Sequence, residues 1–156
     1  MAATSTKTVW LSTPQQHAWR AYISGSTLLF DRLDRDLREQ YDISLPEYEI
    51  LVRLSEARDR SLRMAELASS VAHSRSRVTH TIGRMQDKGL VERRACPTDR
   101  RGVIASLTDQ GWNALVEAAP THVRGVREHL VDTADPDDLA AVGRVFAQVG
   151  DRLAEQ

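Results

Sequence analysis

The fold is decided by residues 62–108, LRMAELASSVAHSRSRVTHTIGRMQDKGLVERRACPTDRRGVIASLT. Apolar side chains recur at helical spacing over residues 64–71, which predicts a short amphipathic helix. Ser74 is a suitable N-cap for a second helix, and Gly89 can take the left-handed conformation that ends it. Two short helices joined by a tight turn at residues 72–73 have the spacing of a helix-turn-helix.

The periodicity changes after Gly89, where residues 90–94 and 103–107 have the composition of two short strands. The residues between them, 96–102, contain turn formers together with Arg100 and Arg101. We therefore predict a β-hairpin with a basic tip. An arginine at such a tip can enter a DNA minor groove, where it senses groove width and negative potential.

The second helix of this stretch has one apolar side and one polar side. At 100° per residue, Val78, Ile82 and Met85 share the side that must face a core. The outer side carries short hydroxyls, arginines, a histidine and a glycine, which can approach base edges and phosphates if the helix lies in a major groove. Four residues are predicted near bases: Ser76, Arg77, Thr79 and His80. Phosphate contacts are predicted for the helix N-terminus at Ser74, which offers free amides, and for Arg75, Arg84, Arg93 and Arg94. The wing tip is formed by Asp99, Arg100 and Arg101.

The charge distribution agrees with a polyanion-binding face. Residues 74–101 carry eight basic and three acidic side chains, a net +5, so the remainder of the 156-residue chain sums to −6. Clustered positive charge favours nucleic acid because each neutralised phosphate releases counterions. A solvated charged surface would explain the charge alone, but not its combination with the helix pair and the hairpin.

The flanking segments are predicted to be helical, after a tail over residues 1–13. One long helix covers residues 15–41. The next begins at a capping box of Ser44 and Glu47, with Pro46 in its first turn. A helix after Thr108 should be bent or broken at Pro120, and a last helix should follow residue 135. That last helix has an apolar stripe and few elements left to cover it, so we expect a twofold mate to bury it.

The same stretch resembles the winged-helix core of the MarR (multiple antibiotic resistance regulator) family. The resemblance is carried by residues 63–68, 74–79, 82–85, 88–93, 99–101 and 107–111. It implies a dimer held by interlocked N- and C-terminal helices, with one recognition helix and one wing per subunit. It also implies repression, with release of DNA when a small phenolic or aromatic effector binds, and it makes Asp99 and Arg101 the wing pair.

Several further residues have both a functional and a simpler structural explanation. Trp19, Tyr22, Phe30 and Tyr48 are candidates for an effector pocket between the first two helices, although aromatic residues at helical spacing more often pack in a core. The lone Cys96 is interpreted as a packing residue rather than a redox sensor. The histidines lack the spacing of metal ligands, and the sequence has no recognisable set of catalytic residues. We therefore expect no bound metal, no cofactor and no enzymatic activity.

Together these patterns predict a mainly α protein with a small β-hairpin wing, a winged helix-turn-helix. Residues 1–156 form a single domain, with residues 45–108 as the DNA-binding lobe and residues 15–41 and 109–154 as dimerisation helices. The predicted function is a cytoplasmic, ligand-responsive repressor that binds a pseudo-palindromic operator on double-stranded DNA as a homodimer, without membrane contact. Two alternatives remain: an architectural protein of low sequence specificity, and a protein-interaction module that uses the basic helix.

Overall fold

The computed structural model describes residues 8–71, 74–97 and 99–154; the turn predicted at residues 72–73 lies outside them. Helix α1 (Thr13–Tyr41) begins at a capping box in which Ser12 Oγ accepts from the Gln15 amide at 3.4 Å. This cap lies within the segment predicted as a tail. Helix α2 (Leu45–Glu56) begins at the predicted capping box, with Glu47 Oε2 2.8 Å from the Ser44 amide nitrogen.

The lobe that follows contains both predicted short helices. A 3₁₀ turn (η1, Arg58–Arg60) and strand β1 (Ser61–Arg63) lead into α3 (Met64–Ser70) and then α4 (Arg75–Asp87). Gly89 follows α4 at a φ of +73° and donates its N–H to the Gln86 carbonyl at 2.9 Å, which confirms the predicted left-handed stop.

The wing is a pair of strands, β2 (Val91–Cys96) and β3 (Asp99–Leu107), in an antiparallel sheet of order β1-β3-β2. Its loop is shorter than predicted, because pairing extends to Cys96 opposite Asp99, beyond a register shift next to Ala95. Arg100 and Arg101 therefore belong to strand β3 and not to the turn. The extension needs Gly102, where a Cβ atom would lie only 2.9 Å from the Cβ of Cys96.

One apolar core joins the lobe to the first helix. Leu37 of α1, Leu51 of α2, Leu67 of α3 and Ile82 of α4 are all fully buried in it. Ala105 from the sheet closes the same core. The lobe, which includes α2, is thus packed directly against α1, and this packing fixes the direction of α4 relative to both helices.

The C-terminal part is helical, as predicted, but it is not broken at Pro120. Helix α5 (Asp109–Val126) starts at Thr108, whose Oγ1 accepts from the Gly111 amide at 2.9 Å, and it continues through the proline. Burial of Leu115, Ala118 and Thr121 on both sides of the proline stabilises the helix against one missing hydrogen bond. A short π-helical segment (η2, Arg127–Val131) then leads to α6 (Pro136–Ala154).

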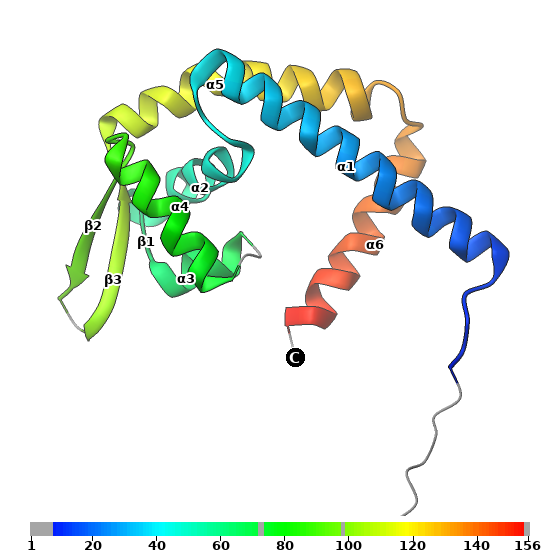
Figure 1. The fold of residues 1–156 in the computed structure, drawn as a ribbon, viewed down its shortest axis with the longest axis horizontal. Helices are drawn as coiled ribbons and strands as arrows, with labels where there is room; N and C mark the ends of the chain where they lie inside the picture. Colours follow the sequence, from blue (N-terminus) through cyan, green and yellow to red (C-terminus); the bar gives the residue numbers. More distant parts are fainter. Residues whose placement is uncertain (1–7, 72–73, 98, 155–156) are drawn as a thin grey trace, which may run out of the picture.

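Helices α1 and α5 lie side by side, and α6 turns back from the end of α5, apart from the wing (Figure 1). No described residue of α6 is buried. Its ring contact with α1 is a stack of Phe146 on Tyr22, with centroids 4.7 Å apart. The apolar stripe of α6 thus remains largely uncovered within one subunit. The large apolar side chains it exposes are Val142, Val145, Phe146, Val149 and Leu153.

Candidate nucleic-acid interface

Helix α4 is anchored on one side and open on the other. Val78, Ile82 and Met85 are buried, which confirms the predicted core face. At its N-terminus, Ser74 Oγ accepts from the Arg77 amide at 3.3 Å.

The predicted base-reading residues are together on the outer side of α4. Ser76, Arg77, Thr79 and His80 are all exposed, and so is Arg75 beside them. Thr79 donates its hydroxyl hydrogen to the Arg75 carbonyl at 2.8 Å, so its oxygen remains able to accept a hydrogen bond from a base. The arrangement presents donors and acceptors from one helix face, which is what groove recognition requires.

Gly83 lies farther along the same outer side. Apart from its chain neighbours and the backbone of its own helix, a Cβ atom placed there would meet no atom of the described residues within 4 Å. The position therefore has no internal packing reason to be glycine. It leaves the α4 backbone open to close approach by another molecule, as its place on the helix predicted.

A third arginine joins two predicted ones in a concave site between α3, α4 and the wing. The cavity, about 360 Å³ in volume, is lined by Arg63, Arg75, Arg93, Thr79 and Asp99 among others. Arg63 immediately precedes α3, and the sequence interpretation did not include it. Its position before a short helix was the available signal, but only the fold brings it beside Arg75 and Arg93. Three guanidinium groups from three elements favour binding of a phosphate.

The wing carries four of the predicted arginines, two on each strand. Arg93 and Arg94 are both exposed on β2, and Arg93 Nε donates to Gln86 Oε1 of α4 at 2.5 Å. Asp99, at the start of β3, also borders the cavity. The side chains of Arg100 and Arg101 lie outside the described part of the structure.

Comparison with known proteins agrees with this geometry. The profile of the MarR family matches residues 41–102. AbsC, a MarR family transcriptional regulator from Streptomyces coelicolor, is 37% identical, with a TM-score of 0.88; the match covers 96% of this chain and 100% of that one. A second MarR family regulator from the same organism, solved in complex with DNA, is 38% identical with a TM-score of 0.90, covering 96% and 93%.

This chain belongs to the MarR family. The curated transcriptional regulator PecS of Dickeya dadantii is also similar, at 25% identity over 127 residues, which cover 79% of this chain and 76% of PecS. The similarity reaches well beyond the residues matched by the family profile, into the flanking helices. The fold class and the family predicted from the sequence are both confirmed.

This MarR-family chain has a mainly apolar cavity of about 500 Å³ where α1, α2 and α5 meet. Phe30 and Tyr48 line this cavity, whereas Trp19 and Tyr22 lie outside it. Contact of any of the four aromatic residues with an effector stays a prediction. Tyr22 stacks instead on Phe146, and Trp19 lies beside Tyr22 with ring centroids 5.9 Å apart. Helix α1 is long enough for its N-terminal half to extend past the lobe.

His122 of α5 is the polar group in this cavity that the sequence interpretation missed. Its ring centroid lies 4.4 Å from that of Tyr48. Its Nδ1 is buried and has no hydrogen-bond partner among the described residues. Burial lowers the pKa of His122 and raises the pKa of Tyr48, so both rings are held neutral at pH 7.

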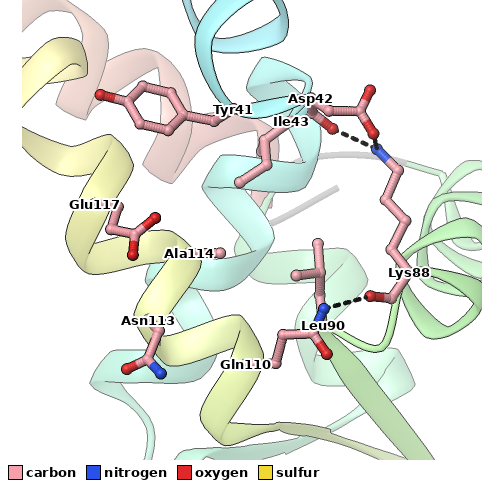
Figure 2. Close-up of a pocket in the computed structure, with 9 residues that line it drawn as sticks. All are labelled: Tyr41, Asp42, Ile43, Lys88, Leu90, Gln110, Asn113, Ala114 and Glu117. Atoms are coloured by element: carbon pink, nitrogen blue, oxygen red, sulfur yellow. Dashed lines mark hydrogen bonds and ion pairs between the residues drawn. The ribbon is translucent and has the colours of Figure 1, made fainter.

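A third cavity, of about 640 Å³, lies between the α1–α2 corner, the end of α4 and the first turns of α5. Figure 2 shows its polar lining, with Asp42 bonded to Lys88 on one side and Glu117 on the other. The backbone carbonyl of Lys88 accepts from Gln110 Nε2 at 3.0 Å. This cavity is more polar than the one around Tyr48 and His122.

The remaining candidates are accounted for by packing. Cys96 is buried at the end of β2 against Gly102, consistent with the interpretation as a packing residue. Across the described residues, no group of three or more His, Cys, Asp or Glu side chains is arranged to hold a metal ion. In the same part of the chain, no helix is both long and apolar enough to cross a membrane.

Proposed function

We propose that this chain is a cytoplasmic regulator of transcription, rather than an enzyme, that binds a pseudo-palindromic operator as a homodimer. The observation that carries the proposal is the exposed, cation-rich side of α4, held by a buried opposite side and flanked by the wing. The 38% identical relative was solved in complex with DNA, which supports DNA as the partner of this chain. The base contacts are assigned to Ser76, Arg77, Thr79 and His80 and the phosphate contacts to Ser74, Arg75, Arg84, Arg93 and Arg94, with Asp99, Arg100 and Arg101 in the wing.

The dimer is assigned to residues 15–41 and 109–154, which flank the DNA-binding lobe at residues 45–108. Helix α6 supports this because its apolar stripe is exposed in one subunit, and burying it would remove Val145 and Val149 from water. Val149→Glu should therefore convert dimers to monomers in sedimentation analysis. The matched variant Val103→Glu, in the wing, should leave the dimer intact.

Binding to the DNA upstream of the chain's own gene tests the proposal directly. We expect a competitor-resistant complex whose footprint shows two symmetric half-sites about one helical turn apart. Arg77→Ala should weaken it, whereas Arg35→Ala, an exposed arginine of α1, should not. Binding that random competitor removes at every salt concentration would instead indicate a low-specificity architectural protein.

The cavity around Tyr48 and His122 is assigned to a small phenolic or aromatic effector that releases the operator. Its volume and mainly apolar lining, with a few polar groups, suit a ligand of one ring. Among the described residues the Nδ1 of His122 has no partner, so it is open to a hydrogen bond with a ligand hydroxyl. A titration with phenol, benzoate and hydroxybenzoates should weaken operator binding by the wild type. His122→Leu should lose the preference for the hydroxylated compounds.

A further inference from the structure

Glu47 is a buried carboxylate at the start of α2 with more partners than a helix cap requires. Its side chain is 3% exposed. Oε2 accepts from the Ser44 amide at 2.8 Å and from Ser44 Oγ at 2.9 Å, which completes the capping box. Those bonds explain why a glutamate follows Ser44 at this spacing, but they do not explain why two cations of another helix approach it.

Both cations lie at the C-terminal end of α4: Arg84 is in its last turn, and Lys88 is its C-cap residue. Arg84 Nη2 lies 3.9 Å from Glu47 Oε1, and Lys88 Nζ lies 3.6 Å from Glu47 Oε2. Lys88 Nζ also donates to the Asp42 carbonyl at 2.5 Å and lies 3.3 Å from Asp42 Oδ2 (Figure 2). We call Glu47, Asp42, Arg84 and Lys88 the corner clamp, because they join the end of α4 to the corner between α1 and α2.

The corner itself is held by further bonds, so the clamp attaches α4 to a fixed frame. Asp42 ends α1 in the left-handed conformation, at a φ of 54°, with its N–H on the Arg38 carbonyl. Asp34 Oδ1 accepts from the Leu45 amide at 2.7 Å and so ties α1 to the first residue of α2. Helix α1 belongs to the region assigned to the dimer, so α4 is connected through the clamp to that region.

Because the corner clamp holds the C-terminal end of α4, a small change of angle there displaces the N-terminal end of the helix. The residues assigned to bases lie in the first turns of α4, whereas the clamp holds its last turn. A helix of 13 residues is about 20 Å long, so a tilt of about 10° at Lys88 would move Arg75 by roughly 3 Å. Hydrogen bonds to base edges do not survive a displacement of that size.

We propose that Glu47 is a positioning residue that sets the angle of the recognition helix against the dimer frame, and thereby the half-site spacing the protein accepts. The inference rests on the proposed function, since it requires a dimer on two half-sites. A glutamate that served only as a cap would affect folding stability and nothing else. A glutamate that also aims α4 affects which operators are bound.

The test compares Glu47→Gln with Glu56→Gln, using the full chain. Both substitutions remove one carboxylate from α2, but Glu56 is exposed, and among the described residues its ion pair is with Arg53, at 3.5 Å. Each protein is titrated with the footprinted operator, with versions whose half-sites are moved by one base pair, and with random DNA. For Glu47→Gln we expect native-operator affinity to fall about fivefold, the scale of coupling within one charge network. The preference of Glu47→Gln for the native half-site spacing should decrease, while its affinity for random DNA should not fall. Glu56→Gln should match the wild type in all three titrations.

Lys88→Gln provides the second measurement and carries the test if Glu47→Gln does not fold. It should relax the spacing preference in the same way, and the double variant should add little to either single change. Spacing preference unchanged in the variants that fold would overturn the inference, whatever happens to their thermal stability. If the wild type itself shows no preference for the operator over random DNA, the proposed function fails. If the wild type and the variants share the same strict spacing preference, the proposed function stands and only this inference fails.

Discussion

Gln86 near the end of α4 accepts a hydrogen bond from Arg93 Nε of strand β2, across 2.5 Å. The two residues are seven positions apart, and the bond crosses from the recognition helix to the wing. It holds the Arg93 guanidinium beside the cavity that Arg63 and Arg75 also line. The wing and the helix therefore present their positive charge as one surface.

Arg93→Ala should weaken binding to operator and random DNA by a similar factor. Arg93 is assigned to a phosphate, and a phosphate contact carries no sequence information. The slope of log K against log salt should fall by about 1, the value for one lost phosphate contact. Fluorescence anisotropy with labelled operator, repeated over a salt series, measures both quantities.

Arg35→Ala is the matched control for that slope, because it removes one exposed arginine from α1 outside the lobe. An unchanged slope in Arg93→Ala, equal to that of the control, would show that Arg93 does not meet DNA. Gln86→Ala, which frees Arg93 without removing its charge, should leave the slope intact and lower affinity by about threefold or less.

Local chemistry was the part of the fold that the sequence could predict. Ser44 with Glu47, Ser74, Thr108 and Gly89 each begin or end an element where their side chains or backbone freedom require it. The core face of α4 also follows from spacing alone. These signals lie within a few residues of one another, so they need no knowledge of tertiary packing.

The parts that the sequence could not predict depend on which distant segments meet. Trp19 and Phe30 lie on the same helix, but α1 extends past the lobe, so only Phe30 reaches the cavity. Similarly, Arg63 and His122 acquire partners only when α4 and α2 pack beside them. The hairpin loop was predicted too long because strand pairing near Gly102 depends on close backbone approach to Cys96.

Gly111→Ala should be strongly destabilising. A Cβ atom at this position would lie 2.0 Å from the Leu90 carbonyl oxygen and 2.8 Å from Leu107 Cδ1. The first turn of α5 would have to move away from the sheet, at a cost of about 3 kcal/mol in the free energy of unfolding. The urea midpoint measures this loss. Gly25→Ala, in an open part of α1, should not show it, and equal midpoints for both variants would contradict the close packing.

Gly83→Ala should have opposite effects on stability and on binding. Outside the local backbone of α4, no atom of the described residues lies within 4 Å of the added methyl group, so replacing glycine inside a helix should stabilise the protein by up to about 1 kcal/mol. If the outer side of α4 enters a groove, the same methyl group should lower operator affinity about tenfold, the cost of a tight steric contact. Gly25→Ala should raise stability alone. Unchanged affinity in Gly83→Ala would place DNA elsewhere on the helix.

Acidification should reduce stability through His122. Burial lowers the pKa of His122 in the folded chain, while the unfolded chain keeps the ordinary value near 6.5. Below pH 6.5 the unfolded state therefore binds a proton that the folded state does not, and the free energy of unfolding falls until the lowered pKa is reached. Chemical denaturation at pH 7.5, 6.5 and 5.5 should give a smaller decrease for His122→Gln than for the wild type. His129→Gln, which removes an exposed histidine of the same C-terminal region, should retain the full wild-type decrease. Equal decreases in all three proteins would mean that His122 is protonated in the folded state as readily as in the unfolded one.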